Sequence, residues 1–316
     1  RRLAAADTIW CPRMSAAIEH PLETTGGTAY ARNVDILDFD DNEPLILVTN
    51  DDGVLSPGLH AAIEAVQGLG QVLVAAPTEQ QTARGRSMVG NPADHFHPTT
   101  VEVDGADVAA FHLDASPALV VRHAFAVLCG GRMPDIVVSG INYGENLGNN
   151  ITISGTVGAA FQAAAQGVPA IAVSRQTDIE HHFVYGDLDW EEPIRVTRRY
   201  AQRLLELSRR RTPGELLPFD VLKIDVPHNC PVGTEERITR LSRHHYFHTV
   251  VSEPRIDGTL SSGTTTIHID RDALSPEDDI YAFAVDRVVS VTPLTLDCTA
   301  SLTRADDLLK GASVRA

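Results

Sequence analysis

The chain has 316 residues, 43% of them hydrophobic, and a formal net charge of −16. It therefore has enough apolar sequence to bury a substantial core, while its charge argues against a nucleic-acid polymer as partner. The longest apolar stretches are too short or too charged to span a bilayer, and the N-terminus lacks the sustained apolar core of a secretory signal. We expect a globular, cytoplasmic protein without a membrane segment.

Residues 1–43 are interpreted as a poorly ordered N-terminal extension. They are polar and only weakly periodic, contain the run Thr-Thr-Gly-Gly-Thr, and end in an acid-rich stretch from Asp35 to Glu43. Residues before Met14 are left out of the fold prediction. One globular domain is expected to span residues 44–316.

The first strong element is Leu45 to Thr49, a continuous apolar run typical of a strand buried on both faces. Ser56 and Pro57 then supply an N-cap and a proline at the first helical position, which predicts a helix from Pro57 to about Gln67. A second apolar run, Gln71 to Ala76, has the pattern of another buried strand. The opening is therefore a βαβ unit.

Strands and helices continue to alternate along the chain. The predicted elements are a β-rich stretch over 101–113, a helix over 116–129, a strand over 136–139, a helix over 156–166, a strand over 170–174, a helix over 190–208 and a strand over 221–226. This alternation implies right-handed crossovers and a sheet covered on both faces. The predicted fold class is α/β, a Rossmann-like three-layer αβα architecture with a mostly parallel sheet.

The pattern changes after Pro227 to β-rich segments separated by turn residues. We interpret residues 228–279 as a projecting C-terminal β-hairpin arm. The core is then expected to comprise residues 44–227 and 280–316, with a strand from Val288 to Val291 returning to the main sheet.

Oxygen-rich side chains follow three of the predicted strands, at the sheet edge where ligands bind in open parallel sheets. Asp51 and Asp52 follow the first, Thr82 the second, and Asn142 and Asn146 the third. Any of these residues alone would more often be an ordinary loop residue. Together they form a hard oxygen set that suits Mg²⁺, Mn²⁺ or Ca²⁺ and is poor for zinc. The sequence therefore predicts a divalent metal site.

Ser154, Gly155 and Thr156 open an alanine-rich helix, where free N–H groups and the helix dipole attract anions. Alone, this tripeptide is most often a plain N-cap. Beside a metal site it becomes a candidate phosphate-binding site. The combination favours phosphate-monoester hydrolysis, a very slow uncatalysed reaction whose catalysis depends on charge neutralisation.

The histidines are interpreted without a role in zinc binding, and the glycine-rich segment 140–148 without a role in binding ATP or NAD. His95 and His97, like the histidine pairs at 181–182 and 244–245, lack the usual zinc-ligand spacing and are interpreted as solvated loop or strand residues. The glycine-rich segment 140–148 is neither a Walker loop nor a correctly placed GxGxxG motif. ATP and NAD binding are therefore not expected.

Four blocks of the sequence resemble the signature blocks of the SurE family. They are Leu-Ile-Leu-Val-Thr-Asn-Asp-Asp-Gly, Val-Ala-Ala-Pro, Pro-Asp-Ile-Val-Val-Ser-Gly-Ile-Asn-Tyr-Gly-Glu-Asn-Leu-Gly and Ser-Gly-Thr-Val-Gly-Ala-Ala, in matching order over roughly residues 45–175. By this resemblance the metal ligands are Asp51, Asp52, Thr82 and Asn142. The residues around the phosphate are Asn146, Ser154, Gly155 and Thr156.

The resemblance implies a metal-dependent phosphomonoesterase acting on nucleoside 5′- and 3′-monophosphates, with some activity on short polyphosphate. It further implies one divalent ion per subunit, Mg²⁺, Mn²⁺ or Ca²⁺, and a homodimer or homotetramer assembled through the hairpin arm. The family usually has serine, glycine and tyrosine where this chain has Thr82, Ala83 and Ile153. The missing tyrosine is expected to alter substrate contacts.

Asp51 and Asp52 are the expected catalytic residues, with Asp52 orienting or deprotonating the attacking water. Direct attack by water is favoured because the Asp-Asp-Gly motif lacks the DxDx(T/V) spacing of aspartyl-phosphate enzymes. Two alternatives stay open. One is a non-catalytic nucleotide or phosphate sensor with the same pocket, and the other is a nucleotide-sugar transferase in which the aspartates form a metal-diphosphate clamp.

Overall fold

The computed structural model describes residues 37–182, 184–212 and 215–299, which belong to one compact unit. Most of the predicted N-terminal extension therefore lies outside the described residues. Its last residues, 37–43, are described. The Asp40 N–H donates to Gln71 Oε1 at 2.8 Å, and Arg132 Nη1 donates to the Asp40 carbonyl at 2.8 Å. This short segment thus packs against the domain through Gln71 and Arg132.

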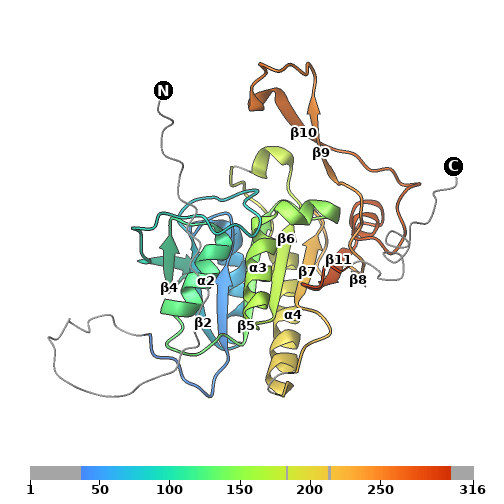
Figure 1. Cartoon of the computed structure of the whole chain (residues 1–316). Coiled ribbons are helices and arrows are strands. Elements are labelled where there is room, and N and C mark those ends of the chain that lie inside the picture. The colour runs from blue at the N-terminus through green and yellow to red at the C-terminus, as the bar shows by residue number, and fades with distance from the viewer. Residues whose placement is uncertain (1–36, 183, 213–214, 300–316) are drawn as a thin grey trace, which may run out of the picture. The chain divides into compact units, whose positions relative to one another are not determined.

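Nine described strands form one sheet in the order β3-β4-β2-β1-β5-β6-β7-β11-β8 (Figure 1). They are β1 (Leu45–Thr49), β2 (Gln71–Pro77), β3 (His97–Val103), β4 (Ala106–Leu113), β5 (Ile136–Tyr143), β6 (Ala170–Arg175), β7 (Val221–Val226), β8 (Glu236–Ile238) and β11 (Val289–Leu294). The six strands from β4 to β7 in this order are parallel, whereas β3 and β11 run antiparallel to their neighbours β4 and β7. The mostly parallel sheet confirms the predicted fold class.

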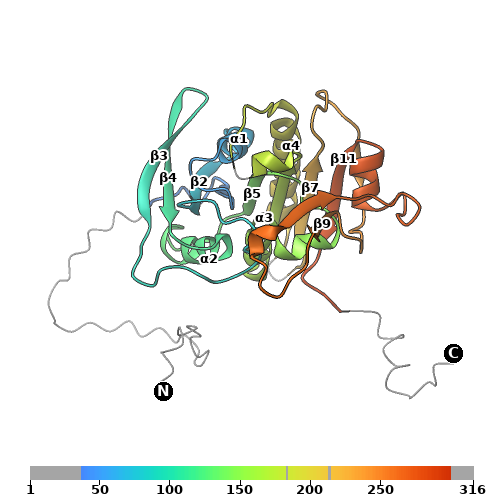
Figure 2. The ribbon, with the colours of Figure 1, turned by 90° about the horizontal axis from the view of Figure 1, so that it is seen from above.

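Helices cover both faces of this sheet. They are α1 (Pro57–Val66), α2 (Pro117–Val127), α3 (Gly155–Ala165) and α4 (Glu191–Arg210), with short 3₁₀- or π-helical segments at Gly148–Ile153, Ile179–His182, Leu260–Ser262 and Tyr281–Val285. Figure 2 shows α1 and α4 on one face and α2 and α3 on the other, which is the three-layer arrangement. Within the described parts of the chain, no helix has the length and apolarity needed to cross a membrane.

The position of β1 in the middle of the sheet explains why its sequence is a continuous apolar run. Ile46 and Val48 point into the core shared with α1 and α4, while Leu45 and Leu47 point into the core shared with α2 and α3. All four side chains are fully buried. Successive residues of a strand face opposite sides, so a strand covered on both faces needs apolar residues at every position. Each such side chain contributes about 1.5–3 kcal/mol.

Strand β5 is longer than the sequence predicted. It continues from the expected end at Ser139 through Gly140, Ile141 and Asn142 to Tyr143, and all of its residues are buried. The glycine- and asparagine-rich composition resembles a loop, but pairing with β6 resumes at Asn142 after an irregularity. Asn142 therefore belongs to the end of the strand, where its backbone pairs with β6.

The C-terminal region divides differently from the predicted limits. The strands β9 (Phe247–Val251) and β10 (Gly263–Ile267) form a separate antiparallel ribbon that projects from the domain in Figure 1. In contrast β8, within the range predicted for the arm, pairs with β11 in the main sheet. Its three residues are too few to show a periodic pattern. The arm proper is therefore shorter than residues 228–279.

Candidate active site

The carboxyl ends of β1 and β5 meet where the strand order reverses. The chain runs from β1 to β2 and β4 on one side, then crosses to β5 on the other side of β1. In open α/β sheets, ligands bind in the crevice at such a switch point. Asp51 and Asp52 follow β1 after the single residue Asn50, and Asn142 lies near the end of β5. The predicted site residues therefore flank the expected ligand position.

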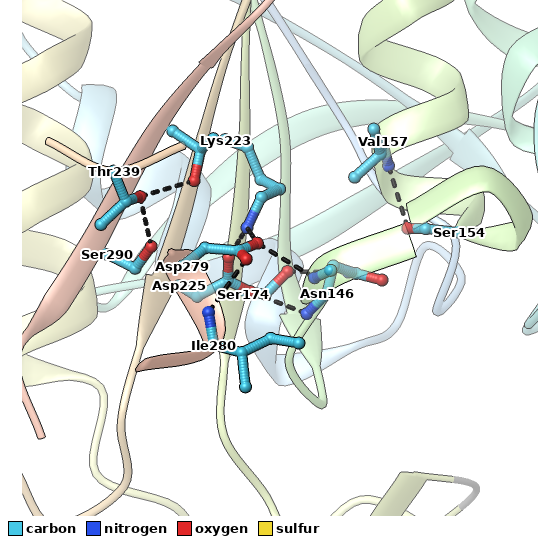
Figure 3. A network of polar contacts seen from close by, with 12 residues as sticks. Asn146, Ser154, Val157, Ser174, Lys223, Asp225, Thr239, Asp279, Ile280 and Ser290 are labelled. Carbon is cyan, nitrogen blue, oxygen red and sulfur yellow. Dashed lines mark hydrogen bonds and ion pairs between the residues drawn. The ribbon is translucent and has the colours of Figure 1, made fainter. Parts of the chain in front are cut away.

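Asp51 lies against the first turn of α3. Thr156 Oγ1 donates a hydrogen bond of 2.5 Å to Asp51 Oδ1, and a Cβ atom on Gly155 would lie 2.6 Å from Asp51 Oδ2. Only glycine permits this approach. Ser154 caps the helix, because its Oγ accepts a hydrogen bond of 3.1 Å from the Val157 N–H (Figure 3). The structure thus brings the predicted phosphate-binding tripeptide and the first carboxylate together.

Asp52 is held by three other segments. Its Oδ2 accepts from the Tyr143 N–H at 3.0 Å and its Oδ1 from Gln80 Nε2 at 2.9 Å. The Tyr185 hydroxyl donates to its main-chain carbonyl at 2.5 Å. Gln80 and Tyr185 were not predicted as site residues, because nothing local in their segments indicates a contact with Asp52.

The loop after β2 lies beside Asp51. The Gln81 N–H donates to the Asp51 carbonyl at 2.6 Å, and the Gly85 N–H donates to the Ile153 carbonyl at 2.9 Å. Thr82, the next residue after Gln81, has an exposed side chain. The loop expected to supply a hydroxyl ligand is therefore adjacent to the two aspartates.

Asn142 and Asn146 are oriented by their amide groups. Asn142 Nδ2 donates to the Gly144 carbonyl at 2.6 Å, so its Oδ1 is the atom left to face a ligand. Asn146 Nδ2 donates to Ser174 Oγ at 2.8 Å, and the Asn146 N–H donates to Asp225 Oδ1 at 2.7 Å (Figure 3). Each of the two side-chain amides therefore keeps its oxygen and a second N–H for a ligand.

A buried ion cluster lies behind Asn146. Lys223 Nζ is 2.5 Å from Asp225 Oδ2 and 3.1 Å from Asp279 Oδ2, and all three side chains are fully buried (Figure 3). Asp279 Oδ2 also accepts from the Gly148 N–H at 3.0 Å. Asp225 and Asp279 therefore hold two points of the loop after β5. From the sequence, Lys223 and Asp225 were predicted as part of the strand over 221–226, without a role at the site.

The electrostatics of the two aspartates favour a cation. Burial raises the pKa of Asp51 and of Asp52 above the ordinary value of 3.8, and the neighbouring Asp51 carboxylate raises that of Asp52 further. Hydrogen bonds, including that from Thr156, offset only part of the effect on Asp51. Adjacent buried carboxylates with no basic partner among the described residues require protons or a metal ion. With Asn142 Oδ1 they form an oxygen set that fits Mg²⁺, Mn²⁺ or Ca²⁺.

Comparison with known proteins identifies the family. The profile described as survival protein SurE matches residues 46–248. The chain belongs to the SurE family. The 5′-nucleotidase SurE of Thermococcus kodakarensis is 38% identical over 258 residues, which cover 81% of this chain and 93% of that relative. The 5′-nucleotidase SurE of Methanocaldococcus jannaschii is 35% identical over 265 residues, covering 80% and 92%.

A solved structure agrees with this SurE assignment. The SurE protein from Aquifex aeolicus superposes with a TM-score of 0.61 at 27% identity, and the match covers 84% of this chain and 100% of that one. The predicted resemblance to the SurE family is therefore confirmed over most of the chain.

Two departures from the usual SurE residues have structural consequences. Ala83 has a φ of 60°, in the left-handed region that disfavours side chains and where the family's usual glycine is unstrained. Ile153 is 56% exposed beside the loop after β2. This SurE chain therefore presents an aliphatic surface there instead of a phenol.

Proposed function

We propose that the chain is a metal-dependent 5′-nucleotidase that hydrolyses nucleoside monophosphates to nucleoside and phosphate. The observation that carries the proposal is the contact of the buried Asp51 carboxylate with the amino terminus of α3, next to the equally buried Asp52. The relatives from Thermococcus and Methanocaldococcus bear the name 5′-nucleotidase, which supports the same activity. The proposal includes 3′-monophosphates and short polyphosphate as further substrates.

The residues of the site have different proposed roles in phosphate hydrolysis. A bound divalent ion would supply charge neutralisation for the phosphoryl oxygens. Its proposed ligands are Asp51, Asp52, Thr82 and Asn142. The first turn of α3, from Ser154 to Thr156, contributes the positive potential of a helix amino terminus, which suits non-bridging phosphate oxygens.

Two side chains are assigned to the reacting groups. Asn146 has a second amide hydrogen beside the one given to Ser174, and we assign it to the phosphate. Asp52 is assigned to orient or deprotonate the attacking water, because its oxygens accept one hydrogen bond each from Tyr143 and Gln80 and retain further lone pairs. Hydrolysis by this route breaks the bond between phosphorus and the ester oxygen.

The test is release of inorganic phosphate from AMP, GMP, 3′-AMP and tripolyphosphate. We expect release with Mn²⁺ or Mg²⁺ and none in EDTA, and the relative rates rank the substrates. A folded protein that binds AMP but releases no phosphate from any substrate would instead be a sensor. Turnover that requires a second substrate would indicate a transferase.

We further propose that the β9–β10 arm joins subunits into a homodimer or homotetramer. The ribbon leaves Val250, Val251 and Ile267 between 39% and 46% exposed, and a two-stranded ribbon buries little apolar surface by itself. Light scattering is expected to give two or four times the chain mass of 34.1 kDa. Replacing Val250 and Ile267 by glutamate is expected to yield monomers, and a monomeric wild type would contradict the proposal.

A further inference from the structure

A second group of metal-ligand side chains lies where the chain enters β3. Asp94, His95 and His97 place their ligand atoms within 4.8 Å of one another. His97 Nε2 is 2.8 Å from Asp94 Oδ1, and the ring centroids of His95 and His97 are 4.4 Å apart. From the sequence, these histidines were predicted to be solvated, without the adjacent Asp94 as a partner.

The backbone brings the three side chains together. Residues two apart in an extended segment point to the same side, which suits His95 and His97 at the start of β3. Asp94 is fixed from behind, because its Oδ2 accepts a hydrogen bond of 2.9 Å from the Asp114 N–H at the end of β4. The carboxylate is therefore oriented by the neighbouring strand and not only by its histidine partner.

A further layer of contacts orients His97. Its ring stacks on that of His112, the residue opposite it on β4, with centroids 5.2 Å apart. His112 Nδ1 is in turn hydrogen-bonded to Thr78 Oγ1 at 2.9 Å. The stacking limits rotation of the His97 ring, and the hydrogen bond to Thr78 fixes the ring on which it stacks.

We propose that Asp94, His95 and His97 form a second metal site that binds a zinc-class ion. Two imidazole nitrogens and one carboxylate suit zinc and related transition ions, whereas Mg²⁺ prefers an all-oxygen set. The ion would lie between His97 Nε2 and Asp94 Oδ1, in place of their hydrogen bond. Their 2.8 Å separation has to widen to about 3.4 Å for tetrahedral zinc, which takes only small side-chain rotations.

The position of this site indicates a structural role. The exposed His95 leaves one side open, so that water completes the coordination. All three ligands lie within residues 94–97, so the ion holds this segment in one conformation, and the hydrogen bond from the Asp114 N–H to Asp94 joins the segment to the end of β4. Zinc at this site is therefore expected to raise the unfolding temperature and not to be required for phosphate release.

The test is a calorimetric zinc titration of the whole protein in saturating Mg²⁺, which occupies the oxygen-rich site around Asp51. We expect one Zn²⁺ per chain in wild type. The substitutions His95→Ala and His97→Gln are each expected to weaken binding at least about tenfold. His245→Ala removes an exposed histidine outside the cluster and is expected to leave binding unchanged.

Two controls separate this site from the proposed catalytic one. The zinc site is expected to persist in Asp51→Ala, and His95→Ala, which alters only an exposed side chain, is expected to keep its Mg²⁺-dependent phosphate release. The readout is binding, so the result holds whatever the activity assay shows. Absence of zinc binding in wild type, or equal binding in wild type, His95→Ala and His97→Gln, overturns the proposal.

Discussion

Replacing Asp51 by asparagine is expected to lower kcat/KM for AMP by on the order of 10³, because an ion that neutralises phosphoryl charge contributes several kcal/mol. Asparagine keeps the size of the side chain and the oxygen that accepts from Thr156, so the loss arises from the missing charge. The measurement is phosphate release in saturating Mn²⁺. Full turnover by Asp51→Asn with metal bound would contradict the proposed site.

When metal is removed, the same substitution is expected to stabilise the folded protein. Because burial raises the pKa of Asp51 in the folded state, its ionised form disfavours folding at neutral pH. In EDTA at pH 8, Asp51→Asn is therefore expected to unfold at a higher temperature than wild type. The difference shrinks as the pH falls towards about 4, where the carboxyl is also protonated in the unfolded chain.

Two controls test this stability effect: the addition of Mn²⁺ and the substitution of an exposed aspartate. Mn²⁺ is expected to stabilise wild type more than Asp51→Asn, because only wild type has the full ligand set. Asp107→Asn, at an exposed position on β4, is expected to change neither property. An Asp51→Asn variant less stable than wild type in EDTA at pH 8 would show that the carboxylate stabilises the fold.

Replacing Lys223 by methionine is expected to lower the free energy of unfolding by about 3–5 kcal/mol, because Asp225 and Asp279 remain buried without a cation. Both aspartates hold the loop after β5, so KM for AMP is expected to rise as well. Urea unfolding and steady-state kinetics measure the two effects.

An ion pair whose basic partner is exposed supplies the comparison. Arg199 contacts Glu236 at 2.8 Å but is 44% exposed, so Arg199→Met is expected to cost less than about 1 kcal/mol. Adding Asp279→Asn to Lys223→Met is expected to recover part of the lost stability, since it removes one uncompensated charge. If Lys223→Met were as mild as Arg199→Met, the buried cluster would not stabilise the domain.

The layered fold was predictable because its strongest signals are local. The apolar run of β1 requires cover on both faces, and the Ser-Pro pairs before α1 and α2 mark where those helices begin at Pro57 and Pro117. The end of β5 was not predictable in this way. Gly140 and Asn142 have low strand propensity, and pairing with β6 overrides it.

The part of the candidate site that could be predicted from the sequence consists of residues at the ends of strands and at the start of α3. Asp51, Asp52 and Asn142 follow or end parallel strands, which places them at one edge of the sheet. The support around them depends on contacts between distant segments. Tyr185 reaches Asp52 across 133 residues and Lys223 reaches Asp279 across 56, and no local pattern encodes either contact.

The arm has a consequence for protein engineering. Residues 252–262 form its tip, and their two ends are already joined by the ladder that pairs Val251 with Gly263. Lengthening a loop whose ends are fixed is inexpensive, at about 0.6 kcal/mol for each doubling. A short peptide inserted at the tip is therefore expected to leave the fold intact, whereas a bulky tag there is expected to weaken the subunit contacts proposed for the arm.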